Sequence, residues 1–137
     1  MDCIFCRILN KEIPNFTVYE DNNVLAFLDI FPCATGHTVV IPKKHFESLW
    51  DMNTENFQAL SAGLRATAER IEARLKPDGM NIGINEGKIA GQAVPHVHWH
   101  IIPRYQDDGG GSMHSIIKNP GTKTPKEIYN ELFKDQV

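Results

Sequence analysis

The stretch that decides the fold is "PHVHWHIIPR", residues 95–104, in which His96, His98 and His100 alternate with apolar side chains. A period of two is typical of a β-strand, so the three imidazoles are predicted to share one face while the apolar residues between them face the core. Neighbouring histidines on such a face lie about 6.6 Å apart at the backbone, because a strand rises about 3.3 Å per residue. Their rings can therefore meet around one small object.

The rest of the chain predicts a sheet with helices. Four stretches rich in β-branched and aromatic residues, separated by turn residues, predict further strands at residues 16–20, 24–30, 37–42 and 80–85. In residues 54–76 apolar side chains recur every three or four positions, which predicts a long amphipathic helix with Thr54 as its N-cap. The segment "TPKEIYNELF", residues 124–133, has a capping-box pattern and predicts a shorter helix. Together these elements indicate an α+β fold, an antiparallel sheet with one long helix packed on it.

Length, composition and charge restrict the class of protein. The 137 residues, 42% of them hydrophobic, are expected to form a single domain, residues 1–137. A formal net charge of -3 argues against nucleic acid as a partner, and no apolar run is long enough to suggest a membrane span. Three cysteines do not pair evenly and no leader pattern is found, so the cytoplasm is the expected compartment. The segment "DDGGGS", residues 107–112, is expected to be flexible.

The three histidines admit three interpretations. Imidazoles two residues apart on a strand can bind zinc, and a zinc-activated water would make the protein a metal-dependent hydrolase. Alternatively, a neutral imidazole is a nucleophile at physiological pH, and its neighbours can donate hydrogen bonds to a phosphoryl group. In the third interpretation the histidines merely occupy a solvated strand face, which suits one isolated histidine better than three in register.

The loop that precedes the strand favours the phosphate. In "NEGKIAGQAV", residues 85–94, Asn85 and Gln92 offer amide donors, and Gly91 lets the backbone approach a ligand closely. Such a loop can hold an anion without net positive charge. The nearest acid is Glu86, so the carboxylate ligands of a catalytic metal site are lacking in this part of the sequence.

The segment "HVHWHII" resembles the H-x-H-x-H strand of the histidine-triad, or HIT, family, in which x is apolar. "IFCRILNKEIP", "VLAFLDIFP" and "GHTVVIPKKH" resemble further family blocks in the same order, so the resemblance covers most of residues 3–105 and leaves residues 106–137 as a variable C-terminal segment. It implies a five-stranded antiparallel sheet with one long and one short helix, and a homodimer with an extended sheet. It also implies cleavage of nucleoside phosphoramidates, acyl-adenylates or dinucleoside polyphosphates, as in small bacterial-type hydrolases related to the Hint branch.

The resemblance assigns catalytic roles to four histidines. His98 would attack the α-phosphorus and form a nucleotidyl-histidine intermediate, which water hydrolyses to a nucleoside monophosphate. His100 and His37 would lie beside the phosphate. The backbone near His96 would orient the nucleophile by accepting a hydrogen bond from its other ring nitrogen, and the two loop amides would contact phosphoryl oxygens. The alternative is a nucleotide-binding or scaffolding module whose activity is vestigial.

The resemblance also assigns a site for a purine nucleotide. Asp29 would accept hydrogen bonds from both ribose hydroxyls. Apolar residues would form the walls of the base pocket, although core packing would explain them as well: Ile4, Phe5, Ile8, Phe27 and Ile30. Ala93 departs from the family pattern, because many members carry a serine or threonine there whose hydroxyl contacts the phosphate or assists the leaving group. That assistance is lost here, which implies a slower reaction or a less demanding leaving group.

A structural zinc site is the last implication. Cys3 and Cys6 form a Cys-x-x-Cys pair, which alone is a weak indication of zinc because a closed site needs two more ligands. In similar bacterial HIT proteins the histidine after "IPK" and the first triad histidine supply them, and here these are His45 and His96. Such a zinc would be structural, and catalysis would require no cofactor. Two free thiols are the alternative.

Overall fold

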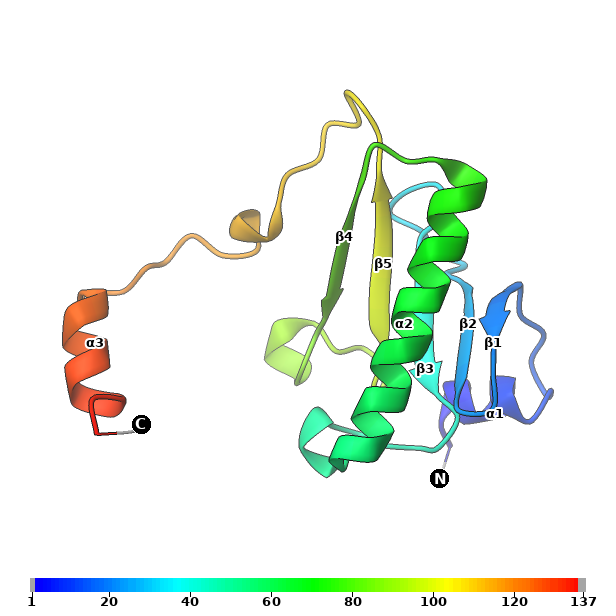
Figure 1. The fold of residues 1–137 in the computed structure, drawn as a ribbon, viewed down its shortest axis with the longest axis horizontal. Coiled ribbons are helices and arrows are strands. Elements are labelled where there is room, and N and C mark those ends of the chain that lie inside the picture. The colour runs from blue at the N-terminus through cyan, green and yellow to red at the C-terminus, as the bar shows by residue number, and fades with distance from the viewer. Residues whose placement is uncertain (1, 136–137) are drawn as a thin grey trace.

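The computed structural model describes residues 2–135 and contains a five-stranded antiparallel sheet in the order β1-β2-β3-β5-β4 (Figure 1). The strands are β1 (Thr17–Glu20), β2 (Val24–Leu28), β3 (Thr38–Pro42), β4 (Gly79–Ile84) and β5 (Trp99–Arg104). The helices are α1 (Ile4–Leu9), α2 (Thr54–Leu75) and α3 (Pro125–Leu132), with 3₁₀ turns η1 (Leu49–Asp51), η2 (Lys88–Ala90) and η3 (Met113–Ser115). The predicted α+β class and five-stranded antiparallel sheet are confirmed.

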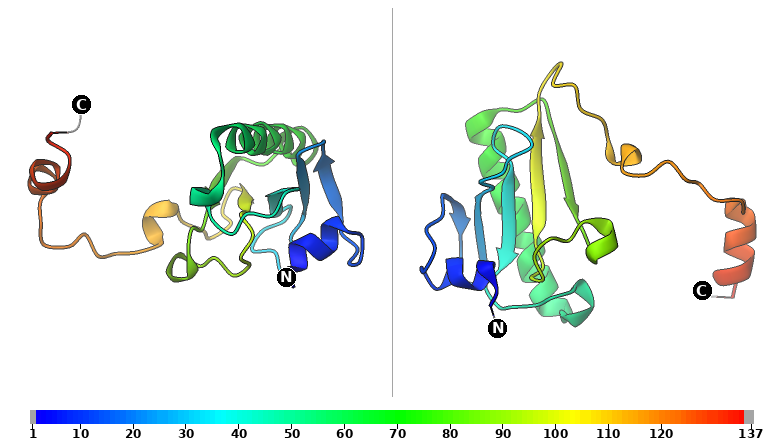
Figure 2. Two further views of the ribbon diagram at one scale, coloured as in Figure 1. Left: turned by 90° about the horizontal axis from the view of Figure 1, so that it is seen from below. Right: turned by 180° about the vertical axis from the view of Figure 1, so that it is seen from behind.

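The central strands of the sheet are covered on both faces. α2 packs across β1, β2 and β3, and its Leu60 and Ile71 join Val24 and Val40 in one apolar core. α1 lies on the opposite face, where Phe5 joins a second core (Figure 2). Successive residues of a strand point to opposite faces, so β3 is buried along its whole length and β2 is buried except at its last residue.

The long helix α2 lies where its periodicity predicts it, but its cap is one residue earlier. The side chain of Asn53 accepts a hydrogen bond from the backbone N–H of Asn56, so Asn53 is the N-cap and the prediction of Thr54 was wrong. Asparagine caps a helix at least as well as threonine, because its side-chain oxygen reaches the same free N–H groups. The helix ends at Leu75, and its C-cap, Lys76, has the left-handed conformation directly before Pro77.

Two differences from prediction occur at the edges of elements. The helix α1 was missed because it has only six residues and no side-chain cap. The last strand, β5, begins at Trp99 instead of His96, since the N–H of Val97 bonds to the carbonyl of Phe46 outside the ladder. The alternation still holds, because Val97 and Ile101 belong to the core beneath α2.

The predicted C-terminal helix forms as α3, with the complete capping box between Thr124 and Glu127. It does not pack on the sheet. The segment after η3 extends away from the sheet and carries α3 to a separate position (Figures 1 and 2). None of the helices in residues 2–135 is long and apolar enough to cross a membrane.

Candidate active site and metal site

His98 lies in the middle of the histidine face, and the backbone fixes its orientation. The ring is almost fully buried and packs against the ring of Phe5, with centroids 5.1 Å apart. Its Nδ1 lies 2.7 Å from the carbonyl oxygen of His96, so Nδ1 carries a proton and donates it to that oxygen. Nε2 therefore keeps its lone pair, as a nucleophile requires. The predicted hydrogen bond to the backbone of His96 is confirmed.

His37 and His100 are linked in a chain of hydrogen bonds that also fixes their tautomers. The backbone N–H of Cys33 donates to Nδ1 of His37 at 3.2 Å, so the proton of a neutral His37 is on Nε2. That nitrogen lies 2.9 Å from Nδ1 of His100 and donates to it. The remaining proton of His100 is then on Nε2. This series of hydrogen bonds thus leaves one free donor, the Nε2–H of His100. The ring centroids of His100 and His98 are 5.0 Å apart.

Burial keeps these imidazoles uncharged. It lowers the pKa of His98 below its ordinary value of 6.5, against the opposing effects of the backbone hydrogen bond and Asp29. Burial also lowers the pKa of His100, helped by His98 and His37, to about 4. The pKa of His37 falls for the same first reason, although Asp29 raises it. All three rings are therefore neutral at physiological pH.

The low pKa of His100 makes the stability of the fold depend on pH. Between pH 6.5 and about pH 4 the unfolded chain binds a proton at His100 that the folded protein does not bind. The free energy of unfolding should therefore be unaffected by this group above pH 6.5 and should fall as the pH is lowered toward 4, with up to about a tenfold change in the folding equilibrium per pH unit. Urea midpoints at several pH values measure this. A His100→Gln variant should show a shallower fall, and an equal fall would contradict the assignment.

Asp29 lies beside the histidines at the end of β2. One carboxylate oxygen, Oδ1, accepts the backbone N–H of Phe31 at 2.9 Å. The other, Oδ2, lies 3.6 Å from Nε2 of His37. The residues predicted to form the base pocket divide into two groups. Phe5, Ile8 and Phe27 are buried in the core beneath α1, whereas Ile4 and Ile30 are exposed.

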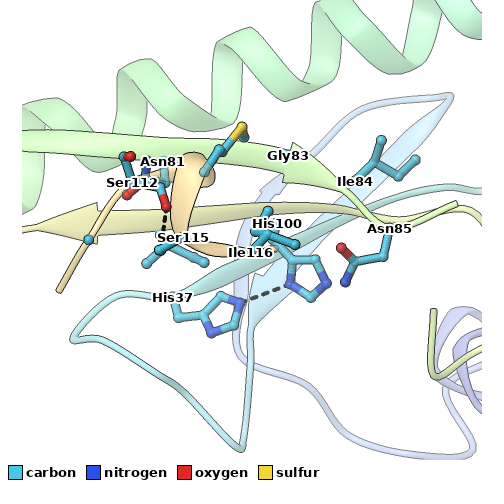
Figure 3. A pocket seen from close by; sticks show the side chains of 12 residues that line it. His37, Asn81, Gly83, Ile84, Asn85, His100, Ser112, Ser115 and Ile116 are labelled. Carbon is cyan, nitrogen blue, oxygen red and sulfur yellow. Dashed lines mark hydrogen bonds between the residues drawn. The ribbon is translucent and has the colours of Figure 1, made fainter. Parts of the chain in front are cut away.

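The loop before β5 uses its two amides differently. Gln92 holds the loop together: its Oε1 accepts the N–H of Gly87 at 2.8 Å, and its Nε2 donates to the carbonyls of Glu47 and Val94. Both of its amide protons are thus engaged within the protein. Within residues 2–135, the side chain of Asn85 makes only a long contact of 3.5 Å, from Nδ2 to the carbonyl of Gly91, and it lies beside the ring of His100 (Figure 3). Of these two loop amides, Asn85 is therefore the one that is available to a ligand.

Gly91 and Ala93 are both exposed on this loop. Gly91 has a φ of 101°, a left-handed conformation that favours glycine. The side chain of Ala93 brings no hydroxyl to the site, as its identity dictates.

A pocket of about 460 Å³ adjoins His37 and His100, and most of its lining was not predicted (Figure 3). Asn81 and Gly83 of β4 line it together with Asn85. Their spacing of two in "NIGIN", residues 81–85, is a signal that could have placed them on the histidine face, because Gly83 pairs with His100 in the sheet. The segment 111–116 supplies the opposite wall, and nothing in the sequence marks it.

The second cluster brings together Cys3, Cys6, His45 and His96, whose ligand atoms all lie within 4.8 Å of one another. Nδ1 of His96 is 3.5 Å from Sγ of Cys3, Nδ1 of His45 is 3.3 Å from Sγ of Cys6, and the two Nδ1 atoms are 3.1 Å apart. Cys3 is the N-cap of α1 and Cys6 lies within that helix. His45 follows β3, and His96 lies three residues before β5. The predicted set of four residues is thus assembled.

These distances fit a tetrahedral zinc site. Zinc at about 2.3 Å from sulfur and about 2.0–2.1 Å from nitrogen sets sulfur about 3.6 Å from nitrogen and two nitrogens about 3.3 Å apart. Nε2 of His96 donates to the carbonyl of Pro42 at 2.9 Å, which directs the lone pair of Nδ1 toward the cysteines. Burial lowers the pKa of His96 to about 4, so this ring is neutral. Two thiolates and two imidazoles would close the shell and leave no position for water.

Comparison with known proteins points in the same direction. The HIT domain family matches residues 10–107. The chain is 50% identical over 117 residues to a HIT-like protein of Methanocaldococcus jannaschii, covering 85% of this chain and 90% of that protein. It is 38% identical over 133 residues to adenosine 5'-monophosphoramidase of Saccharomyces cerevisiae, covering 97% and 79%. A crystal structure of a HIT family member from Bacillus subtilis superposes with a TM-score of 0.83 at 39% identity, covering 96% and 92%.

Proposed function

Since the chain belongs to the histidine-triad (HIT) family, we propose that it is a hydrolase that releases nucleoside monophosphates by attack of His98 on an α-phosphorus. The observation that carries the proposal is the environment of His98. Its Nδ1–H is held by a backbone carbonyl, and its ring, with a lone pair on Nε2, lies next to His100, which in turn accepts a hydrogen bond from His37. The substrates would be nucleoside phosphoramidates, acyl-adenylates or dinucleoside polyphosphates. The yeast relative that acts as a phosphoramidase supports this class.

The reaction would take place in two displacements. In the first, the lone pair of Nε2 of His98 forms a bond to phosphorus, and the bond from phosphorus to the leaving atom breaks with its electron pair on that atom. In the second, a water oxygen attacks the same phosphorus and gives up one proton, which balances the proton taken up by the leaving atom in the first step. The bond to Nε2 of His98 breaks with its electron pair on nitrogen, which restores the neutral ring. One water is consumed, and the products are a nucleoside monophosphate and the protonated leaving group.

The donors around the phosphate would come from His100 and Asn85. The tautomer chain leaves the Nε2–H of His100 free to donate, either to a phosphoryl oxygen or to the leaving atom. Asn85 offers an amide on the same side (Figure 3). The side chain of Ala93 offers no donor, so in this chain the proton on His100 would take a larger share of the stabilisation than in relatives with a hydroxyl there.

We assign Asp29 to the ribose hydroxyls because its Oδ2 is not used by the backbone and lies next to His37. The kcat/KM for substrates with deoxyribose should be lower, by an amount equivalent to roughly 1 to 3 kcal/mol of transition-state binding. This is the scale of a charged hydrogen-bonding group left unsatisfied. Steady-state rates on matched adenosine and deoxyadenosine phosphoramidates measure this difference. Asp29→Asn should reduce the preference, and equal efficiency of the wild type on both sugars would remove Asp29 from the site.

We propose that the metal of the second cluster is zinc and that its role is structural. When bound, it would cross-link the N-terminal segment to His96, which lies two residues before the nucleophile. Cys3, Cys6, His45 and His96 would hold it, and His98 would remain outside the shell. Catalysis by the histidines would need no cofactor.

We further propose a homodimer in the cytoplasm. The sheet supports the dimer, because β4 lies at its edge and offers an unpaired row of backbone groups to a second copy. The three cysteines support a reducing compartment, since none of them forms a disulfide in the described chain.

The direct test is release of AMP from adenosine phosphoramidate and from diadenosine tetraphosphate by the purified protein. Turnover of either compound together with an adenylyl group trapped on the protein supports the proposal. Binding of AMP without turnover of either would favour a nucleotide-binding module instead. Turnover that stops when zinc is removed from an intact fold would favour the metal-dependent hydrolase.

A further inference from the structure

The short helix α1 touches both of the sites described above. Cys3 and Cys6, its N-cap and its third residue, belong to the metal cluster. Phe5 lies between them in the sequence, and its ring contacts the rings of His96 and His98, with centroids 5.8 Å and 5.1 Å away. One aromatic side chain of α1 thus contacts a member of the metal cluster and the proposed nucleophile.

α1 also borders the place assigned to the nucleoside. Phe5 packs on Phe27 of β2, with ring centroids 5.6 Å apart. Asp29 follows two residues later, and its N–H donates to the carbonyl of His37, which continues the pairing of β2 with β3. Side chains two residues apart on a strand share a face, so Asp29 lies on the sheet face that α1 covers. Ile4, at the start of α1, is 47% exposed and is free to contact a ligand there.

The polar contacts that attach α1 to the rest of the protein all involve the two cysteines. The backbone hydrogen bonds of the helix run within residues 3–13, and its ion pair is local as well. Within residues 2–135, the side chains of the helix and its N-cap form hydrogen bonds with the body of the protein only through Cys3 and Cys6. The other contacts are apolar, as at Phe5 and Ile8. A helix of six residues is not stable by itself, so its position depends on these contacts.

We propose that zinc at the cysteines and a nucleoside at Asp29 strengthen each other's binding, because both need α1 in its packed position. The proposal rests on the function proposed above. A metal that joins the cysteines to His45 and His96 would suppress local opening of the helix. A nucleoside that contacts α1 would then bind without first having to close it. Such a coupling is reciprocal, so zinc and nucleoside must change each other's affinity by the same factor.

The first experiment compares the affinity of adenosine for the zinc-loaded and the zinc-free protein, at a temperature at which both are folded. Removal of zinc should raise the Kd of adenosine about tenfold, a usual size for coupled sites, and stoichiometric zinc should restore it. Saturating adenosine should lower the Kd of zinc, measured against a competing chelator, by the same factor. With a substrate, the change should appear in KM and not in kcat, because His98 and its donors are unchanged.

AMP separates this coupling from a metal that acts on the phosphate. Adenosine carries no phosphate, so the ratio of the AMP affinity to the adenosine affinity reports the contribution of the phosphate alone. This ratio should be the same with and without zinc. A ratio that falls when zinc is removed, with an unchanged affinity for adenosine, would place the metal at the phosphate and overturn the proposal.

Hydrogen exchange tests the attachment of α1 without any nucleotide. The amides of Arg7 and Asn10 donate to the carbonyls of Cys3 and Cys6 at 3.0 Å and 2.9 Å. Their protection factors should fall about tenfold when zinc is removed, and in the zinc-free protein they should be lower than those of β3. Equal protection of α1 and β3 in that sample would mean that zinc acts only on the fold as a whole, which contradicts the proposal.

Two exposed isoleucines provide matched variants, since Ile4 belongs to α1 and Ile30 follows β2. Ile4→Ala removes a contact between the helix and the nucleoside, so it should bring the ratio of the adenosine affinities with and without zinc toward one. Ile30→Ala should weaken adenosine equally in both forms and leave this ratio unchanged. Equal effects of the two variants on the ratio would exclude α1 as the link between the sites.

The outcomes distinguish the coupling from the reaction. Adenosine that binds equally well with and without zinc overturns the coupling, while AMP release from a substrate still supports the hydrolase. If neither adenosine nor AMP binds the zinc-loaded protein, and no substrate yields AMP, the proposed function fails and the coupling fails with it.

Discussion

Replacing His98 with alanine is expected to lower kcat by about a thousandfold or more, because the variant has no lone pair at the position from which phosphorus is attacked. The change should not abolish binding, since Asp29, His100 and Asn85 remain in place. The measurement is single-turnover release of labelled AMP. A second readout is the adenylyl group retained by the wild type after a rapid acid quench, which the variant should lack.

The fold of the His98 variant needs its own control, because the ring is buried and packs on Phe5. His98→Asn keeps more of the volume, and its urea midpoint and AMP affinity should stay close to those of the wild type. Turnover above about a hundredth of the wild-type rate in a folded variant would contradict covalent catalysis by His98.

Removal of the zinc site is expected to have the largest effect on stability. The double variant Cys3→Ser with Cys6→Ser should bind no zinc, and its melting temperature should fall by on the order of 10 °C. Loss of a ligand present at a hundred times its Kd costs about 2.7 kcal/mol, and each kcal/mol shifts the melting temperature by about 2–8 °C. Elemental analysis measures the bound zinc and calorimetry measures the melting temperature, both on protein purified without a chelator.

Cys33→Ser is the matched control, because Cys33 is exposed and lies outside the cluster. This variant should retain zinc and have the same melting temperature as the wild type. Activity of the double variant at a permissive temperature should largely survive, since His98 and its phosphate contacts remain. Wild-type protein without zinc would refute the metal assignment, and activity lost in proportion to zinc from an intact fold would revive the metal-dependent hydrolase.

The sequence predicted the elements whose patterns are regular. The alternation around His98 and the long periodic stretch of α2 were sufficient, because one buried face imposes a repeat that can be read directly. It did not predict α1, whose burial depends on contact with β2 and β3 rather than on a repeat of its own. The start of β5 was misplaced for a related reason: the backbone near His96 bonds outside the ladder.

The candidate site was predictable only in part. The resemblance supplied the four members of the metal cluster, which no local pattern could join, since Cys3 and His96 are separated by most of the chain. It did not reveal that Gln92 donates its amide protons to the carbonyls of Glu47 and Val94, nor that Arg104 donates to Asp108 and to the carbonyl of Gly111. Such facts depend on which distant carbonyl or carboxylate a donor meets, and a sequence does not state that.

His96 combines two functions that use different atoms. Its ring faces the cysteines, while its carbonyl oxygen accepts the hydrogen bond from the Nδ1–H of His98. Every amino acid has a carbonyl oxygen, so the hydrogen bond that orients His98 does not depend on an imidazole at position 96. In evolutionary terms, the imidazole of His96 is needed for the metal site with the cysteines and not for the attack by His98. A descendant that lost Cys3 and Cys6 would be free to replace the side chain at 96 and still keep its nucleophile aimed.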